Sequence, residues 1–187
     1  TESALNNFRE YSMVQPRQMD KYFGFTKNEV KALCEKYDMD YSEMEKWYDG
    51  YQIGNEPSMF NPSSVMQAID SKQCWSFWAS TGSFDNVSHY ISGNFFGLKD
   101  DFIKMLTGER CRVNTTKFQN DMSIVRSKDD VFTVLIHLGY LAYDPMKQRC
   151  YIPNKEVELE ITNAIENTDW TEVNRALYDS EELLEAT

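Results

Sequence analysis

Phosphate-binding sequences are missing from this chain. Neither G-x-x-x-x-G-K-[ST] nor G-x-G-x-x-G occurs in its 187 residues, although both are common means by which a backbone cradles nucleotide phosphates. The motifs H-E-x-x-H, G-x-S-x-G and S-x-x-K are missing as well. We therefore expect no catalysis from this chain by itself, and the sequence assigns no catalytic, cofactor-binding or metal-binding residue.

Metal-ligating residues are few and widely spaced. The two histidines, His89 and His137, each lie in apolar helical sequence, which favours packing over a zinc or general-base role. The four cysteines lie 37 to 40 residues apart, which is neither a zinc-ligand spacing nor the density of a disulfide scaffold. The sequence therefore predicts buried free thiols in a reducing cytoplasm.

Long apolar runs are also missing. No stretch of 18 apolar residues occurs, and the N-terminus has neither the basic nor the apolar region of an export signal. We expect a cytoplasmic protein without a membrane partner. The chain starts at Thr1 without a methionine and ends in an acidic helical sequence, so we expect it to be part of a longer protein; the alternative is removal of the initiator methionine, which gives the same start.

Negative charge is plentiful but unevenly distributed. Of the net charge of −11, residues 154–187 carry −8, while residues 110–153 hold seven basic and four acidic residues. This mild positive excess is smaller than the basic surface of a typical nucleic-acid-binding protein. Carboxylates at helical spacing, such as Glu156 and Glu160, are expected on a solvated helix face.

Helix signals dominate the first 82 residues. Thr26 and Glu29 form a capping box before an expected helix to Tyr37, and the same signature starts a second helix at Ser42. After an extended piece at 51–54, a turn is expected at 55–57. Asn61-Pro62 starts a further helix, because Asn caps the helix and Pro gives up an amide that would be unpaired.

The hexapeptide at 46–51 is the most distinctive motif. Trp47, Tyr48 and Tyr51 surround Asp49-Gly50, and three aromatic rings are costly to expose. One interpretation is a structural corner: Asp49 accepts hydrogen bonds from local amides, Gly50 takes a positive φ and the rings pack beneath it, locking the helices to the segment at Asn61. The alternative is a recognition site, where the rings stack on a base or sugar or dock a partner.

The second part of the chain predicts a different arrangement. Helices are expected at 84–92 and 98–107, and a helix buried on all sides at 129–138. A hairpin follows at 140–152 with turn residues at 144–148, and a last helix begins at Pro153-Asn154. A helix entering a hairpin in this way is typical of a winged-helix unit. The basic residues that could contact DNA there are Arg126 and Lys128 at the start of the buried helix, and Lys147 and Arg149 in the wing.

Several motifs together resemble one family. They are Asn6-Asn7, 22–26 with Glu29-Val30, 46–51, Asn61-Pro62 with Ser64-Val65, 78–82, 138–141, and 152–154 with Glu156-Val157. In this order the set resembles the AAA-ATPase-like proteins of anaerobic bacteria, which usually carry a C-terminal PD-(D/E)XK nuclease-like domain. The chain resembles the region between the two, with neither the ATPase core nor the nuclease-like domain.

The resemblance implies a regulatory or interaction portion of a larger protein. ATP and Mg²⁺ are expected only in the missing core, and the partners are other domains of the parent protein or a separate protein. The expected fold is mainly α, with a helical lid-like region at 1–82, a winged-helix-like unit with a small β-hairpin at 83–167 and an acidic helical segment at 168–187. The alternative is a DNA-binding winged-helix module.

Overall fold

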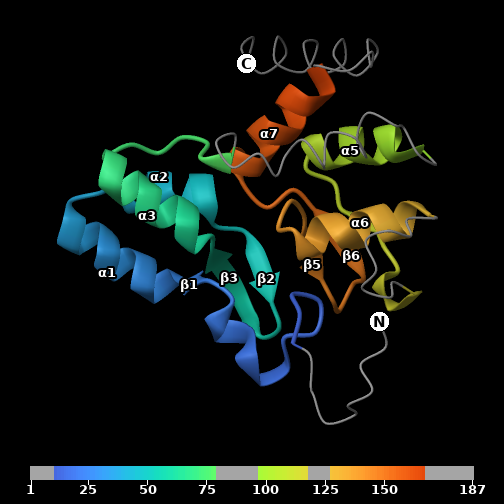
Figure 1. Cartoon of the computed structure of the whole chain (residues 1–187), viewed down its shortest axis with the longest axis horizontal. Coiled ribbons are helices and arrows are strands. Elements are labelled where there is room, and N and C mark those ends of the chain that lie inside the picture. Colours follow the sequence, from blue (N-terminus) through green and yellow to red (C-terminus); the bar gives the residue numbers. More distant parts are fainter. Residues whose placement is uncertain (1–10, 79–96, 118–126, 167–187) are drawn as a thin grey trace, which may run out of the picture.

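The structure is a computed structural model that describes residues 11–78, 97–117 and 127–166. It holds helices and two small antiparallel sheets of three strands each (Figure 1). The helices are α1 (Lys27–Tyr37), α2 (Tyr41–Tyr48), α3 (Pro62–Ser71), α5 (Leu98–Leu106), α6 (Lys128–His137) and α7 (Lys155–Glu166), with 3-10 turns η1 (Arg17–Tyr22) and η4 (Thr115–Lys117). The strands are β1 (Phe25–Thr26), β2 (Tyr51–Ile53), β3 (Glu56–Phe60), β4 (Cys111–Arg112), β5 (Ala142–Asp144) and β6 (Arg149–Tyr151).

In the first part of the structure, residues 11–78, two predicted helix starts are confirmed and one is wrong. Thr26 and Glu29 form both halves of the capping box of α1, and Asn61 caps α3 with Pro at its first position. However, α2 begins at Tyr41, because the Asp40 carboxylate accepts the Ser42 amide at 2.7 Å. An aspartate two residues earlier thus takes the capping role that the sequence assigned to Ser42.

The first sheet contains a strand that the sequence analysis missed. The order is β1-β3-β2, so β3 is the central strand although it includes Pro57. Because a proline removes a ladder hydrogen bond, the sequence predicted a turn rather than a strand at residues 55–57. The register of β2 and β3 shifts between Tyr51 and Ile53, and β1 pairs only with Met59 and Phe60, so Pro57 lies at an irregularity outside the paired positions.

The second part of the structure, residues 97–117 and 127–166, agrees more closely with the prediction. The hairpin β5–β6 is confirmed, with Tyr143 opposite Cys150, and β4 adds to its free edge in the order β4-β6-β5. Every residue of α6 from Val131 to Ile136 is at most 2% exposed, so the predicted burial on all sides is confirmed for these six residues, whereas Leu138 lies after the helix and is 38% exposed. The short strand β4 was not predicted. With two sheets, the fold has more β structure than the expected single hairpin.

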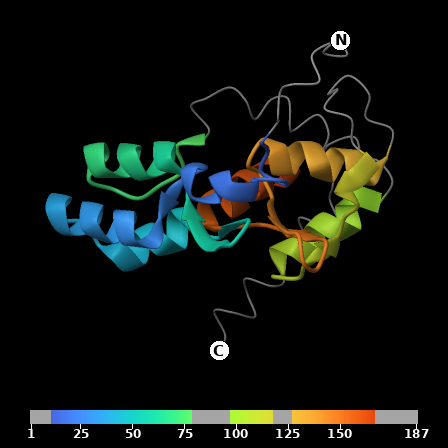
Figure 2. The same ribbon diagram turned by 90° about the horizontal axis from the view of Figure 1, so that it is seen from below.

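Three apolar clusters form the core of the part of the chain that the structure describes. One lies among α1, α2 and α3, and a second among α5, α6, α7 and the second sheet. The third joins the parts, because Ala142 of β5 packs with Tyr51, Ile53 and Met59 of the first sheet. Figures 1 and 2 show α1–α3 gathered at one end, α5 and α6 at the other, and β2 beside β5 between them.

Several predictions fall outside the described residues, namely the boundary near Gly82, the helix at 84–92, His89, Arg126 and the segment 168–187. Cys34, Cys74, Cys111 and Cys150 are free thiols, and three are buried while Cys74 is half-buried. Across 11–78, 97–117 and 127–166, no group of three metal-ligating side chains is found. None of the helices in these ranges is long and apolar enough to cross a membrane.

Candidate functional site at the Trp47–Tyr51 corner

The corner forms where α2 ends and β2 begins. Trp47, Tyr48 and Tyr51 are 9%, 0% and 6% exposed, so none of the three rings offers an open face for stacking. Asp49 is extended and Gly50 has a φ of +110°, a conformation that side chains rarely adopt. The positive φ predicted at Gly50 is therefore present, and the buried rings disfavour the recognition alternative.

Gly50 rests directly on the chain just before α7. A Cβ at this position would lie 1.9 Å from the Pro153 carbonyl oxygen, a backbone atom that cannot swing aside. The Tyr151 hydroxyl donates to the Gly50 carbonyl at 3.0 Å. The corner thus meets residues about one hundred positions away in the chain, rather than only the nearby helices.

Asn154 ties the corner to the start of α7. Its side-chain amide donates to the Asp49 carbonyl at 2.9 Å, while its Oδ1 accepts the Val157 amide at 3.1 Å. One side chain therefore caps α7 and holds the corner. The sequence identified Asn154 as a helix start, but no local signal indicated its second bond.

The corner and the residues that it contacts just before β5 and from the last residue of β6 onward, Gly139 and 151–154, form what we call the joint, and the corner tyrosines contribute to it. Tyr51 donates its hydroxyl to the Gly139 carbonyl at 2.8 Å, just after α6. The Tyr48 hydroxyl donates to the Trp75 carbonyl at 3.0 Å and accepts the Trp75 amide at 3.1 Å. Burial raises the pKa of both phenols, so both remain neutral. Tyr51 therefore bonds to the backbone just after α6, and Tyr48 bonds to the backbone after α3.

The Asp49 carboxylate is held by a partner that the sequence analysis did not identify. Ser58 on β3 lies with its hydroxyl 2.8 Å from each carboxylate oxygen. Burial raises the pKa of Asp49, while the bonds from Ser58 and from the Gly50 amide oppose that rise. The predicted hold by local amides is therefore incomplete, because the hydroxyl comes from the adjoining strand.

Asn61 and Pro62 lie next to the corner, at the start of α3. The Asn61 amide donates to the Tyr48 carbonyl at 3.3 Å, and its side chain accepts the Ser63 amide at 3.0 Å. Trp47 faces the other way, with Lys155 4.4 Å above its ring and its indole N–H 3.3 Å from Glu43. The corner therefore contacts α3 on one side and α7 on the other.

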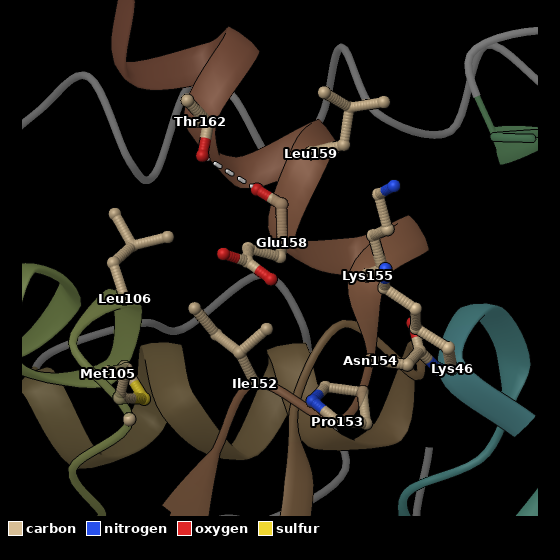
Figure 3. Close-up of a pocket in the computed structure, with 11 residues that line it drawn as sticks. Lys46, Met105, Leu106, Ile152, Pro153, Asn154, Lys155, Glu158, Leu159 and Thr162 are labelled. Atoms are coloured by element: carbon tan, nitrogen blue, oxygen red, sulfur yellow. Dashed lines mark hydrogen bonds between the residues drawn. The ribbon is translucent and has the colours of Figure 1, made fainter. Parts of the chain in front are cut away.

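Two hollows lie beside the corner. One, of about 170 Å³, is bounded partly by Tyr51, Asn61 and Pro62, and is smaller than the roughly 300–1,000 Å³ of ordinary ligand sites. The other is a groove of about 550 Å³ between α5 and α7. Figure 3 shows Lys46 and Lys155 on one side of it, Met105 and Leu106 on the other, and Glu158 between.

Glu158 gives this groove its electrostatic character. Glu158 is exposed, but the partial desolvation of its carboxyl in the groove raises the pKa of that carboxyl, while the nearby Lys155 and Lys46 lower it. The groove therefore combines an apolar floor with one acid and two ammonium groups, all next to the corner.

Of the four basic residues proposed for DNA contact, Arg126 lies outside the described residues and the other three are found on α6 and on the hairpin. Lys128 forms an ion pair with Asp101 of α5. Lys147 and Arg149 are both exposed on the hairpin. Arg112, which was not singled out, lies directly opposite Arg149 and is exposed too.

The expected solvated face at Glu156 and Glu160 is wrong. These side chains are 0% and 5% exposed and lie under the segment that follows α3. Their spacing of four residues marks one face of a helix, but a sequence does not show that polar backbone will cover that face.

A scan of the chain against protein-family models finds no match. Searches of curated proteins and of solved structures find no significant match either. The family resemblance therefore depends on the motifs of the sequence alone.

Proposed function

We propose that this chain is a regulatory or interaction module of a larger AAA-ATPase-like protein, with a helical lid-like region joined to a winged-helix-like unit. In this proposal the chain does no chemistry. It positions other domains of its parent, or a protein partner, relative to one another. ATP and Mg²⁺ belong to a core outside the chain.

The order of elements in the second part supports the winged-helix-like assignment. Helix α5, strand β4, helix α6 and hairpin β5–β6 follow one another along the chain, and the strands lie in the order β4-β6-β5. In winged-helix units a hairpin likewise follows the buried helix directly and takes an earlier strand onto its edge. Here α7 then returns to the first part, where it contacts α2.

The observation that carries the proposal is the joint at the corner. Gly50 packs on Pro153. The Tyr51 hydroxyl donates to the Gly139 carbonyl, and the Asn154 side-chain amide donates back to the Asp49 carbonyl. Such a set of buried bonds between separate cores transmits a displacement of one part to the other, because packed interiors shift as units. A rigid coupling of this kind suits a module that relays position.

The proposal that this chain belongs to a larger AAA-ATPase-like protein can be tested by sequencing the flanking regions of its gene. We expect a phosphate-binding loop encoded upstream and a nuclease-type carboxylate set downstream. In the full-length parent, Gly50→Ala should change the rate of ATP hydrolysis, whereas Gly108→Ala, another positive-φ glycine but with open space around it, should not. The purified chain should neither hydrolyse Mg-ATP nor gain melting temperature from it.

Two results would overturn this proposal. One is flanking sequence without any phosphate-binding loop. The other is ATP hydrolysis by the purified chain that is lost on a single substitution within it.

The register of β4 and β6 favours a second candidate, binding of a nucleic-acid backbone by the hairpin. Arg112 lies directly opposite Arg149, and like charges in this position destabilise a sheet unless an anion lies between them. Lys147 lies in the adjoining turn. Against this, α6 is buried and Lys128 is paired with Asp101, so little remains to read bases.

An electrophoretic titration at low salt separates the candidates. Hairpin binding predicts affinity that falls steeply with salt and falls further on Arg149→Glu or Lys147→Glu, but not on Lys31→Glu, which changes an exposed lysine of α1. Absence of binding at low salt, or equal losses in all three variants, would eliminate the hairpin site.

A further inference from the structure

The segment after α3 is attached to α7 through two buried carboxylates. Glu156, fully buried in the first turn of α7, accepts the Phe77 amide on its Oε1 at 2.8 Å. One turn later Glu160, which is 5% exposed, accepts the Ser76 hydroxyl. These bonds dock residues 76–78 onto α7, on the side of the molecule where the first part meets the second.

Two buried oxygens at this attachment have no hydrogen-bond partner among the residues that the structure describes. They are Glu156 Oε2 and Ser64 Oγ, the latter from α3. Buried polar atoms are nearly always paired, and an unpaired one carries a desolvation cost. A serine hydroxyl both donates and accepts, so these two atoms can pair with each other in either protonation state of Glu156. The protonation state therefore depends on the burial and the charges around the carboxyl.

The surroundings of Glu156 do not offset a negative charge. In the ranges that the structure describes, no lysine or arginine forms an ion pair with Glu156 or Glu160. The titratable and polar groups that act on Glu156 are Tyr48 of α2, Tyr51 of β2, Ser64 of α3, the Phe77 amide, Trp78 and Glu160 of α7. None of these groups is a cation.

Burial is the main cause that raises the pKa of Glu156, to about 7, and Glu160 adds to the rise. The Phe77 amide and the side chains of Ser64 and Trp78 lower it, but burial outweighs them.

We propose that Glu156 is the proton-operated latch of this attachment: protonated, it keeps residues 76–78 docked on α7, and once ionised it favours their release. In the released state water reaches the carboxyl, which then has its ordinary pKa. The docked state binds the proton more tightly, so docking is fully stable below that ordinary value. It weakens as the pH rises towards about 7 and weakens no further above it.

This latch is separate from the proposed interaction role, because it depends only on the contacts of α3, residues 76–78 and α7. It concerns local opening rather than global unfolding, so it is measured at one amide. The Phe77 amide is suitable because it donates to Glu156 itself.

The experiment is hydrogen exchange of the Phe77 amide in the whole chain at pH 5 and pH 8, corrected for the intrinsic exchange rate. We expect protection at least tenfold lower at pH 8. Glu156→Gln, which keeps the acceptor and adds a permanent donor, should show equal protection at both pH values. Glu35→Gln removes a carboxylate from an exposed position on α1 and should behave as the parent chain.

Ser64→Ala provides a second readout that a purely structural contact would not give. Since Ser64 favours the ionised form, its removal should move the midpoint of the protection change to higher pH. Equal Phe77 protection at pH 5 and 8 in the parent chain, or a midpoint that stays in place in Ser64→Ala, would overturn the latch. So would a folded Glu156→Gln variant that keeps the full pH dependence.

Discussion

At the scale of single residues, Gly50 leaves less room for a Cβ than any other glycine in the described part of the chain. Its φ of +110° disfavours any side chain, and a Cβ would overlap the Pro153 backbone. We expect Gly50→Ala to lower the free energy of unfolding by about 3–5 kcal/mol, since strain and overlap combine. Urea denaturation measures this difference directly.

Gly108 provides the matched control for Gly50. Its φ is +85°, but nothing lies within 4 Å of its missing Cβ. Gly108→Ala should therefore cost only about 1 kcal/mol, the conformational part alone. Equal costs at the two glycines would show that the packing on Pro153 contributes nothing.

Tyr51 tests the hydrogen bond across the joint. Tyr51→Phe keeps the ring but leaves the Gly139 carbonyl without this donor, so we expect a loss of about 1–3 kcal/mol in unfolding free energy. Tyr22→Phe, at a side chain that is 69% exposed, should change stability by less than about 0.5 kcal/mol. A Tyr51→Phe variant as stable as its parent would contradict the bond's importance.

At the scale of elements, α7 depends on a cap that also crosses the joint. Asn154→Ala removes both bonds and should cost about 2 kcal/mol, whereas Asn154→Asp keeps the acceptor for Val157 and loses only the donor to Asp49. The aspartate variant should therefore retain more of the α7 helicity that circular dichroism measures. If both variants lose equal helicity, the cap is not the main role of Asn154.

Local signals predicted the elements that local contacts determine. The capping box at Thr26, the Asn61-Pro62 start and the buried run of α6 each depend on neighbours within a few positions, and each is present. Strands β1 and β4 have two residues each, too few for a pattern, and β3 was concealed by Pro57.

The candidate site was harder to predict because its partners are distant. The sequence indicated that Gly50 needs a special conformation, but not that Pro153 lies against it. It likewise showed Glu156 and Glu160 as a polar helix face, while the Ser76 hydroxyl and the Phe77 amide that bond to them lie about 80 positions earlier. Contacts of this range carry no local periodicity.

At the scale of the whole molecule, two apolar cores within residues 11–78, 97–117 and 127–166 are joined by one small cluster and by the corner. Such an arrangement predicts that damage to the joint reaches both parts. The cores themselves, in α1 and α5 for example, should keep their own packing.

Hydrogen exchange on the whole chain, comparing the parent with Gly50→Ala, tests this coupling most directly. We predict that the variant loses amide protection on both sides of the joint, at residues 47–53 and at residues 139–157, while α1 and α5 keep theirs. Loss confined to residues 47–53, with 139–157 protected as in the parent, would contradict the account.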